Sequence, residues 1–386
     1  MDHSAARATA APQLHVVLVL AAATGGIGAH VRSLTQGLVA HGVTVMVCAP
    51  EGVDRLHGFS AAGARLHTVD ITPTSGARSD AVAIGELRRA FTGADVVHAH
   101  GLRAGLLSDL ALRTAGRFPG IRPETPLVVT SHHALLATGL ERRLQRLMER
   151  RVVRAADLVL GASSDLVARA RELGATDARL GPVAAPPLPP AGLDRAAARA
   201  ALPGGDDGRP VVLAIGRLVV QKCFSLLLDA VPHFAAPGGP MPHVLLAGDG
   251  PERQALYDRV RSEKLPVDLL GYRTDIPELL AAADVVVLSS RWEARSLVAQ
   301  EAMRAGVPVV ATAVGGVPEL VGDAAVLVPF ADPRALGGAV RDLLGDEKRR
   351  TELAEAGRAQ ARTWPDEAAT VAQVLSVYDE LVQRQV

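Results

Sequence analysis

Asparagine is absent from this chain of 386 residues, and lysine occurs at only three positions. We interpret this bias, with arginine as the usual cation, as GC-rich coding and not as a functional signal. The two cysteines, Cys48 and Cys223, lie far apart and have no Cys-x-x-Cys spacing. This usage is typical of a reducing compartment and argues against a disulfide framework or a cysteine metal cluster.

Net charge and long apolar runs are lacking as well. The 41 basic side chains balance the 41 acidic ones, so we expect neither nucleic acid nor an acidic surface as a partner. No apolar run reaches the length of a membrane span, and Met1 to Pro12 lack the apolar core of a signal peptide. We therefore expect a cytoplasmic protein.

What the chain does contain is a regular alternation of short apolar runs and amphipathic stretches. Short, nearly continuous β-branched runs between helices are typical of parallel sheets that are covered on both faces. At this length two such domains are expected, each with its own core. The expected strands are Val16–Leu20, Val43–Cys48, Leu66–Val69, Val96–His98, Leu127–Thr130, Leu158–Leu160, Val211–Ile215, Val244–Ala247, Val267–Leu270, Val285–Leu288, Val307–Ala311 and Val326–Val328.

The alternation breaks between Gly181 and Pro210, where Pro-Pro, Gly-Gly and Asp-Asp pairs occur. We interpret this stretch as an interdomain linker that carries a short helix near Ala196. The fold class is therefore α/β, with two doubly wound, Rossmann-like domains. The expected division is a first domain over residues 1–182, a linker over 183–208, a second domain over 209–363 and an amphipathic helix over 364–386, after the Trp364-Pro365 break.

Two carboxylates, Glu293 and Glu301, lie eight positions apart, the first just before an expected helix and the second inside it. A helix N-terminus attracts phosphate, and carboxylates accept hydrogen bonds from sugar hydroxyls. The pair therefore suits a ligand that is both phosphorylated and rich in hydroxyls. The stretch from Glu293 to Thr312 resembles the E-x7-E signature of retaining, family-4-type glycosyltransferases (glycosyl transferases group 1).

The resemblance implies the GT-B fold, in which two Rossmann-like domains face each other across a cleft. The first domain would then lie on the acceptor side, the second would bind the nucleotide sugar, and the C-terminal helix would cross back to the first domain. The resemblance covers most of the chain and is densest from Gly216 to Val328.

Two cations follow the first expected strand of the second domain. Arg217 comes directly after Gly216, and Lys222 comes five residues later. They can converge on one diphosphate, Arg217 as a planar fork and Lys222 as a point charge; two solvated cations are the alternative. The family pattern is G-R-x-x-x-x-K-G, and Cys223 stands here at the final glycine position. Cysteine fits that position poorly if the backbone there needs a positive φ.

By resemblance, several loops of the second domain line the nucleotide and the donor sugar. Between the two acids, Arg295 and Ser296 replace an aromatic-glycine pair that is common in the family. Arg295 either adds a phosphate contact or marks altered donor choice or a weakened enzyme. The residues expected to bind the nucleotide sugar are Gly25, Gly26, Gly28, Gly216, Arg217, Lys222, Gly248, Gly250, Tyr272, Arg273, Glu293, Arg295, Ser296, Leu297 and Glu301.

A glycine-rich loop from Thr24 to His30 leads from the first expected strand into a helix. Its glycines let backbone N–H groups approach phosphate or sugar closely. The spacing is not that of a dinucleotide fingerprint, because Val31 occupies the third glycine position. A tight strand-to-helix turn is the alternative, but the loop also resembles the GG-x-x-x-H loop of the family.

Histidines follow two successive expected strands, His98 and His100 after one and His132 and His133 after the next. Such strand ends converge on one edge of a sheet, although a single histidine more often has a structural role. No acidic residue accompanies them at ligand spacing, so we expect no metal ion. The resemblance selects His132 over His133 as the residue beside the donor sugar, with His30, His98 and His100 on the acceptor side.

A basic amphipathic stretch spans residues 139–154, with Leu140, Leu144, Leu147 and Met148 on one face. One interpretation is a helix packed on the core whose cationic side is solvated. The other is peripheral docking onto an anionic membrane at its inner face, as in family members that glycosylate lipids. The cationic face comprises Arg142, Arg143, Arg146, Arg150 and Arg154.

The leading hypothesis is a retaining glycosyltransferase that uses a nucleotide-diphosphate sugar as donor substrate and no cofactor. Arg217, Lys222 and helix N-termini would stabilise the leaving diphosphate in place of a metal. Glu301 would bind the ribose, Glu293 the hydroxyls of the donor sugar, and His132 the attacking hydroxyl. The expected catalytic residues are thus His132, Glu293, Arg217 and Lys222.

Other functions of the same fold stay open at this point. A nucleotide-sugar epimerase or a glycan phosphorylase is one rival, but the last lysine, Lys348, is expected in an exposed helix and not in a pyridoxal site. A non-catalytic nucleotide-sugar-binding protein is the other, because Cys223 and Arg295 depart from the family pattern. The base, the sugar and the hydroxyl acceptor depend on a few pocket contacts, so the sequence leaves them open.

Overall fold

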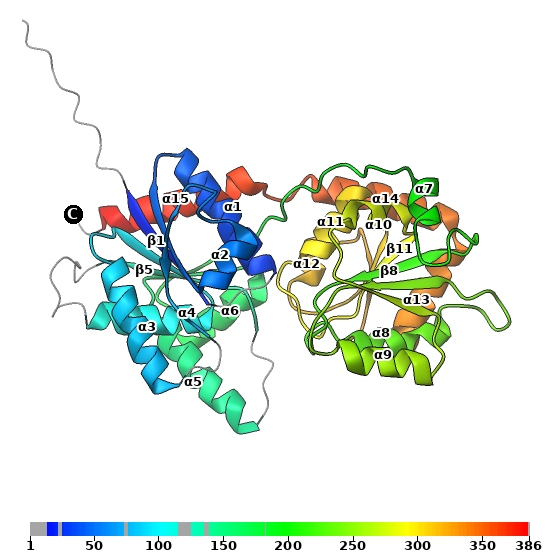
Figure 1. Ribbon diagram of the computed structural model, residues 1–386, viewed down its shortest axis with the longest axis horizontal. Coiled ribbons are helices and arrows are strands. Elements are labelled where there is room, and N and C mark those ends of the chain that lie inside the picture. Colours follow the sequence, from blue (N-terminus) through cyan, green and yellow to red (C-terminus); the bar gives the residue numbers. More distant parts are fainter. Residues whose placement is uncertain are drawn as a thin grey trace, which may run out of the picture. The chain divides into compact units, whose positions relative to one another are not determined.

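The computed structural model describes residues 14–21, 25–72, 76–114, 125–134, 139–181 and 183–384. The chain divides into two compact units, each built on one sheet (Figure 1). Unit 1 consists of Met1–Ala162, Leu166–Gly181 and Glu367–Val386, and unit 2 of Ser163–Asp165 and Pro182–Asp366. The expected α/β class with two doubly wound domains is confirmed.

Unit 1 holds seven parallel strands in the order β3-β2-β1-β4-β5-β6-β7. All six strands expected in the first half are present, with small shifts of their ends. The strand that the sequence analysis missed is β7, only three residues long and at the edge of the sheet. The strands are β1 (His15–Leu20), β2 (Thr44–Ala49), β3 (Arg65–Thr68), β4 (Val96–His100), β5 (Leu127–Ser131), β6 (Leu158–Gly161) and β7 (Ala178–Leu180).

Strand β1 shows why this sheet is covered on both faces. Its successive side chains point to opposite sides, so Val17 and Val19 join one apolar core while Val16 and Leu18 join another. Helices α3 and α4 contribute to the first core, and α1 and α15 to the second. The helices of this unit are α1 (Gly26–Ala40), α2 (Glu51–His57), α3 (Ala77–Ala90), α4 (Leu102–Arg113), α5 (Gly139–Ala155), α6 (Ser164–Leu173) and α15 (Glu367–Gln383).

Unit 2 holds six parallel strands in the order β10-β9-β8-β11-β12-β13. All six were expected, but β12 starts at Val309 and not at Val307. The reason is Gly306, which ends the preceding helix with a φ of 75°, so that Val307 still donates its N–H to Ala302. The strands are β8 (Val211–Ile215), β9 (His243–Ala247), β10 (Val267–Gly271), β11 (Val285–Leu288), β12 (Val309–Thr312) and β13 (Val326–Val328).

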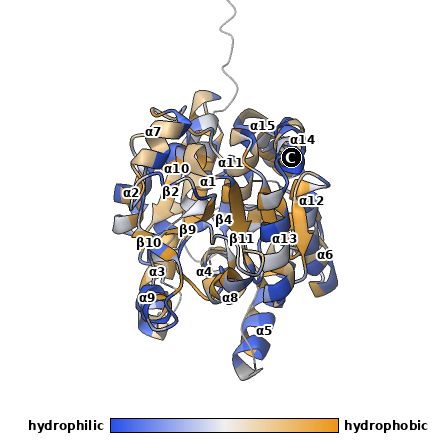
Figure 2. Cartoon of the chain, turned by 90° about the vertical axis from the view of Figure 1, so that its right-hand side faces the viewer, coloured by the Kyte–Doolittle hydropathy of each residue, from blue (hydrophilic) through white to orange (hydrophobic). Residues whose placement is uncertain are grey.

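The helices of unit 2 also cover both faces of their sheet. Residues of α8, α9 and α13 share one apolar core, and residues of α7, α10 and α11 share the other. In Figure 2 the sheet strands carry mainly hydrophobic colours, whereas α9 is mostly hydrophilic. The helices are α7 (Arg195–Ala200), α8 (Phe224–Ala230), the short 3₁₀ helix η2 (Val231–His233), α9 (Arg253–Ser262), α10 (Ile276–Ala282), α11 (Leu297–Ala305), α12 (Val317–Val321), α13 (Pro333–Gly345) and α14 (Glu347–Ala361).

Residues 183–208, interpreted from the sequence as a linker, lie in unit 2 and pack on it. The expected short helix is α7, whose N-cap Asp194 accepts a hydrogen bond from the N–H of Ala197 at 2.8 Å. Ala198 and Leu202 are buried in a core of unit 2, and Arg199 forms an ion pair with Asp284. The turn-forming pairs therefore mark irregular backbone and not a free tether.

Helix α15, at the C-terminal end of the chain, packs on unit 1. Val371 lies so close to Gly37 of α1 that a β-carbon at Gly37 would come within 2.3 Å of it. Tyr378 is fully buried, and its hydroxyl lies 2.6 Å from Nδ1 of His98. The C-terminal segment is thus part of the core behind β1 and β4.

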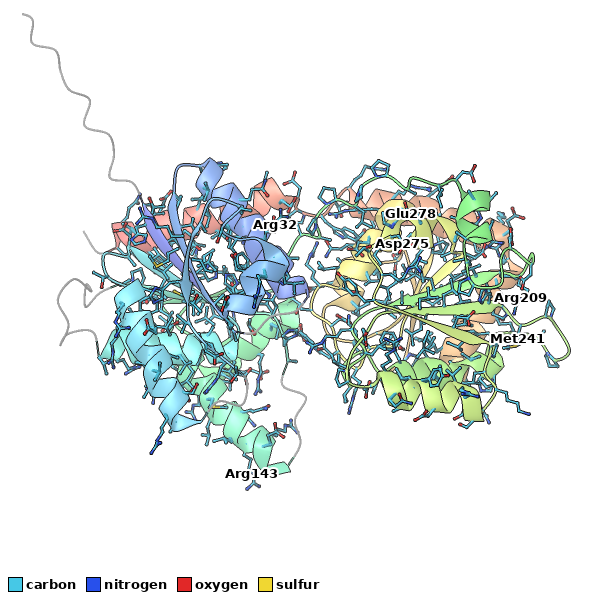
Figure 3. All side chains as sticks on the ribbon, in the orientation of Figure 1. Arg32, Arg143, Arg209, Met241, Asp275 and Glu278 are labelled. Atoms are coloured by element: carbon cyan, nitrogen blue, oxygen red, sulfur yellow. The ribbon has the colours of Figure 1, made fainter. Side chains whose placement is uncertain are left out.

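Helix α5, for which the sequence left a core-packed and a membrane-docking interpretation open, packs on the core near its C-terminal end only. Val152 and Val153 near its end are buried, but Leu144 and Leu147 are 59% and 64% exposed. Arg143 lies at the outer end of this helix in Figure 3, and α5 is largely in hydrophilic colours in Figure 2. Among the described residues, no helix is both long and apolar enough to cross a membrane.

Candidate functional site

Both sheets reverse their strand order at one point, between β1 and β4 in unit 1 and between β8 and β11 in unit 2. Ligands of open α/β sheets bind beyond the carboxyl ends of the strands at such a point. In unit 1, His100 is the last residue of β4 and His132 follows β5; in unit 2, Lys222 follows β8 and Glu293 follows β11. The topology therefore brings the candidate residues to one place in each unit.

In unit 2, glycines let the loops after β8 and β9 approach each other. A β-carbon at Gly248 would lie 1.8 Å from the carbonyl oxygen of Gly216, and one at Gly250 would lie 2.5 Å from that of Leu218. The N–H of Leu218 donates to Asp249 at 2.9 Å. Gly248 and Gly250 are therefore required by the packing of the two loops, whatever ligand lies beyond them.

Lys222 and Glu293 form an ion pair with 2.5 Å between Nζ and Oε1. The same oxygen accepts a hydrogen bond from Oγ of Ser290 at 2.6 Å. Both members of the ion pair are largely removed from solvent, with the Lys222 side chain 20% and the Glu293 side chain 8% exposed. The structure thus joins two of the expected catalytic residues, which are 71 positions apart in the chain.

Backbone contacts hold the two loops of this ion pair together. The side-chain amide of Gln221 donates to the carbonyl oxygen of Trp292 at 3.0 Å, and the backbone carbonyl oxygen of Gln221 accepts from the N–H of Arg291 at 2.8 Å. Behind them, the indole N–H of Trp292 donates to Asp165 at 2.8 Å. The sequence analysis named none of these supporting residues, because nothing in their spacing shows a contact across the sheet.

Arg217 and Arg295 are two cations of this region for which no ion pair is found among the described residues. Arg217 is exposed, and its side chain makes no ion pair or hydrogen bond within the described part of the chain. Nε and Nη2 of Arg295 are buried without a hydrogen-bond partner, and burial lowers the pKa of its guanidinium. The guanidinium lies over the ring of Trp364, 5.9 Å from its centroid, so its charge has a cation–π contact. Its two unpartnered nitrogens are suited to an anion that accepts hydrogen bonds.

Glu301 lies in the second turn of α11, which starts at Leu297. Ser296 caps this helix, its Oγ accepting from the N–H of Ala299 at 3.4 Å. Burial raises the pKa of the Glu301 carboxyl to about 7, although Arg304 and Lys222 act in the opposite direction. Near neutral pH this carboxyl is therefore poised between its neutral and ionised forms.

The loop after β10 presents two further expected residues. Tyr272 is 73% exposed, so its ring is free to stack on a ligand. Arg273 is held by Asp275, with 2.7 Å between Nε and Oδ1. Arg273 is therefore already neutralised on its own loop, unlike Arg217.

Cys223 has a left-handed backbone, with φ 49° and ψ 48°, directly before α8. The sequence analysis had named this as the glycine position of the family pattern. A residue with a β-carbon is strained in this conformation by about 1–2 kcal/mol. The thiol lies 3.7 Å from the hydroxyl of Ser225.

In unit 1 the loop after β1 carries the expected glycines; Thr24, its first residue, lies outside the described residues. Gly25 has a φ of 132°, which favours glycine, and caps α1, in which Gly26 is the first residue. At Gly28 a β-carbon would lie 2.1 Å from Nε2 of His57. The ring of His57 from α2 therefore occupies the space beside Gly28 of α1.

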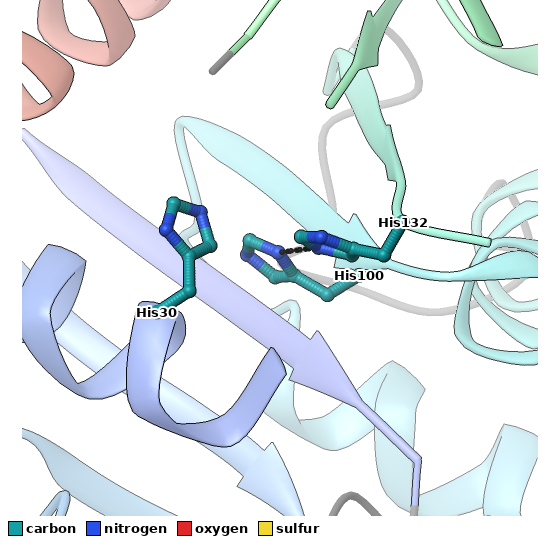
Figure 4. A group of neighbouring side chains, drawn as sticks. All are labelled: His30, His100 and His132. Atoms are coloured by element: carbon teal, nitrogen blue, oxygen red, sulfur yellow. Dashed lines mark hydrogen bonds between the residues drawn. The ribbon is translucent and has the colours of Figure 1, made fainter. Parts of the chain in front are cut away.

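The histidines of unit 1 form a buried cluster (Figure 4). His98 lies in β4, within the expected strand Val96–His98, whereas His100 was expected after the strand and is its last residue, because β4 stays paired with β1 and β5 as far as His100. Nδ1 of His100 lies 3.2 Å from Nε2 of His132, and the ring of His30 from α1 lies 5.5 Å from that of His132. His133, the alternative that the resemblance rejected, is exposed.

Burial keeps these imidazoles neutral. It lowers the pKa of His30 to about 4 and that of His98 to about 3, and it also holds the pKa values of His100 and His132 well below the usual range. Both ring nitrogens of His98 are engaged in hydrogen bonds, Nδ1 with the hydroxyl of Tyr378 and Nε2 with the hydroxyl of Thr130, each at 2.6 Å. His30, His100 and His132 offer ring nitrogens that all lie within 4.8 Å of one another, which is close enough to consider a metal ion.

The fold and the position of the site place the chain among proteins of the GT-B type. HepE of Anabaena, solved with UDP, has a TM-score of 0.74 and 20% identity, covering 95% of this chain and all of that one. Sucrose-phosphate synthase of Thermosynechococcus elongatus has a TM-score of 0.76 and 22% identity, covering 96% of this chain and all of that one. At these identities the likeness shows the fold alone.

Sequence comparison shows the family. The model of the family "Glycosyl transferases group 1" matches residues 201–360, and that of the "Glycosyl transferase 4-like domain" matches residues 25–186. The D-inositol 3-phosphate glycosyltransferase of Xylanimonas cellulosilytica is 32% identical, over 93% of each chain. The glycogen synthase of Mycobacterium tuberculosis is 28% identical over 91% of this chain and 90% of its own. The chain belongs to the group 1 glycosyltransferases and is an enzyme that transfers a sugar.

The strain at Cys223 leads to a stability prediction. Cys223→Gly relieves the left-handed strain but adds backbone entropy to the unfolded chain, so the net gain in unfolding free energy should be about 0.5–1 kcal/mol. Chemical denaturation of the variant and of the wild-type protein measures it. Cys223→Ala is the matched control, because it removes the thiol and keeps the β-carbon. An equal gain in both variants would assign the effect to the thiol and not to the backbone.

Proposed function

We propose that this enzyme moves a sugar from a nucleotide-diphosphate sugar to a hydroxyl acceptor with retention of the anomeric configuration and without a metal in the transfer step. The observation that supports this most directly is the buried ion pair of Lys222 and Glu293, with the unpaired guanidinium groups of Arg217 and Arg295 on the neighbouring loops. One carboxylate and three cations suit a ligand that combines hydroxyls with a diphosphate.

The cations have distinct proposed roles towards the diphosphate. Arg217 is free to bind it as a planar fork, and Lys222 supplies a point charge. Arg295, which the family pattern lacks, has two buried nitrogen atoms whose hydrogen bonds a phosphate oxygen would complete. Together with the N-terminus of α11, these groups would stabilise the charge on the leaving group.

The acids are proposed to bind the two hydroxyl-bearing parts of the donor. Glu293 is held in place by Lys222 and Ser290, so that its remaining oxygen is available to the hydroxyls of the sugar. Glu301 would accept hydrogen bonds from the ribose. On unit 1, His132 is proposed to hold the attacking hydroxyl, with His30 and His100 beside it.

Retention is proposed through attack on the same face from which the diphosphate leaves. A double displacement would need a carboxylate nucleophile, and both acids named at this site, Glu293 and Glu301, are proposed to bind hydroxyls of the donor. The leaving phosphate would then accept the proton of the attacking hydroxyl. The proposal of retention also rests on family membership. The motifs of this chain resemble those of retaining glycosyltransferases, and that resemblance implies retention.

Turnover with purified protein tests the proposed function. UDP-sugars are the first donors to offer, since the structurally similar HepE of Anabaena was solved with UDP-glucose. The donor panel then extends to GDP- and ADP-sugars with hydroxyl acceptors, and NMR of the product reads the anomeric configuration. A product with inverted anomeric configuration would contradict the proposed retention. Tight donor binding without any turnover would favour the non-catalytic binding protein.

The first half of α5 suggests a second property, peripheral contact with an anionic membrane. Leu144 and Leu147 are exposed apolar side chains, and Arg142, Arg143 and Arg146 are exposed beside them. Exposed leucines next to arginines are suited to the boundary between lipid headgroups and acyl chains. An acceptor carried by lipid would then be held at the same surface.

The first prediction from the proposed function concerns Lys222. Lys222→Ala should weaken nucleoside-diphosphate binding by about 2 kcal/mol, because a charge-assisted contact to the diphosphate is lost. Nucleoside binding should change little, so titration calorimetry with both ligands on one variant separates charge from folding. Lys348→Ala, on the exposed face of α14, is the control. Equal losses for both ligands would exclude a diphosphate role.

The second prediction is a pH dependence set by Glu301. The ribose diol donates hydrogen bonds and prefers the carboxylate, whereas the pKa of about 7 leaves this group partly protonated at neutral pH. Donor affinity should therefore rise between about pH 6 and 8, by up to about tenfold for each pH unit below the pKa. A nucleotide sugar is the appropriate ligand, because its diphosphate diester does not titrate in this range. In Glu301→Gln the dependence should vanish.

The third prediction tests the membrane contact. Wild-type protein should co-sediment with vesicles that contain anionic lipid at low salt and be released as salt screens the attraction. Replacing Arg142, Arg143 and Arg146 with Glu should abolish this binding and leave donor affinity unchanged.

The matched control for this experiment replaces three exposed arginines elsewhere, Arg32, Arg78 and Arg362, with Glu. It changes the net charge by the same amount but leaves α5 intact, so it should retain most of the vesicle binding. If the wild-type protein does not bind such vesicles at low salt, the membrane proposal fails.

A further inference from the structure

Two histidines at the carboxyl edge of the unit 1 sheet form a direct pair, marked by the dashed line in Figure 4. Nδ1 of His100 lies 3.2 Å from Nε2 of His132, and the planes of the two rings are within 22° of each other. Both side chains are buried, with only 2% and 7% exposed. Two ring nitrogens at this distance share one hydrogen bond, so that one ring donates and the other accepts.

The strands and a neighbouring ring hold His100 in this orientation. In the register of β4 with β5, His100 is paired with Thr130, and His132 follows two residues later. His98 stacks on His100 with 4.3 Å between the ring centroids, and its own two nitrogens are bonded to the hydroxyls of Tyr378 and Thr130. Because His98 is fixed at both nitrogens, it also fixes the plane of the His100 ring.

The second nitrogen of His100 decides which ring donates. Burial holds the pKa values of both imidazoles well below their usual range, so each ring is neutral and carries one N–H. Nε2 of His100 is buried and has no hydrogen-bond partner. A proton on Nε2 would leave a buried N–H without an acceptor, and orphaned buried donors are rarer in folded proteins than unfilled acceptors. The proton of His100 therefore belongs on Nδ1, which faces His132.

We propose that His100 is a positioning residue that donates its Nδ1–H to Nε2 of His132 and thereby fixes the proton of His132 on Nδ1. In a neutral imidazole, the hydrogen bond of one nitrogen sets the protonation of the other. His132 then meets the attacking hydroxyl as a hydrogen-bond donor and not as a base.

This assignment deepens the proposed function and rests on it for the role of His132 towards the acceptor. As the bond from the anomeric carbon to the phosphate oxygen breaks and the bond to the acceptor oxygen forms, the acceptor proton passes to the leaving phosphate. His132 keeps its own proton throughout. The tautomers of the two rings, by contrast, are a property of unit 1 and need no substrate.

The first measurement reads these tautomers in the wild-type protein without any ligand. In protein labelled with ¹⁵N in its histidines, NMR distinguishes a ring nitrogen that carries a proton from one that does not. The signals are assigned by their loss in His100→Asn and His132→Asn. We expect the proton on Nδ1 in both rings. A proton on Nε2 of either ring would overturn the proposal.

The second measurement compares two variants of nearly the same shape, His100→Asn and His100→Leu. The amide N–H of asparagine lies about where Nδ1 of histidine does, whereas leucine has no donor. His100→Asn should therefore keep His132 protonated on Nδ1 and retain most of the turnover. His100→Leu should release this tautomer and lower kcat by at least about tenfold, the scale of a buried group left without its hydrogen bond.

Binding of a nucleoside diphosphate, measured by calorimetry, is the control for a merely structural effect. It should be the same in both variants, because its proposed contacts lie in unit 2. Equal kcat values in His100→Asn and His100→Leu would overturn the positioning role. If the wild-type protein shows no turnover with any donor, the proposed function fails, while the NMR measurement still decides the tautomers.

Discussion

The structure depends on one topological constraint, the point in each sheet where neighbouring strands send their helices to opposite faces. In unit 2, β8 leads to α8 on one side and β11 leads to α11 on the other. In unit 1, β1 and β4 do the same with α1 and α4. The loops that follow these strands therefore diverge, and polar side chains such as Lys222, Glu293 and His100 collect where the apolar cores end.

The ion pair of Lys222 and Glu293 shows how such a site is maintained. Removing two charges from water costs several kcal/mol per ion, and their attraction offsets this only with good geometry and further hydrogen bonds. Ser290 and the loop contacts of Gln221 supply these. A buried ion pair adds little to stability on balance, which favours the proposed role of both residues in binding the donor.

Several residues break local rules at the same places. Cys223 takes a left-handed backbone, Arg295 has two buried nitrogens without a hydrogen-bond partner, and His100 has one. Such violations are expected at functional sites, because a ligand can supply the missing interactions. For Arg295 a ligand of matching chemistry, an anion, is proposed. For Cys223 the structure shows the strain and no compensating contact beyond Ser225.

The sequence by itself determined the α/β class, twelve of the thirteen strands and the order of the motifs, because buried parallel strands read as continuous apolar runs. It did not predict β7, since three residues at a sheet edge carry too little pattern. It left open whether the first half of α5 packs on the core, and it gave no packing contacts for residues 183–208, because burial depends on what lies opposite a residue and not on its own spacing. Only the tertiary structure decided that Lys222 pairs with Glu293 and that His30 joins His100 and His132. These contacts join residues far apart in the chain, and no periodicity along one segment encodes a distance across the sheet.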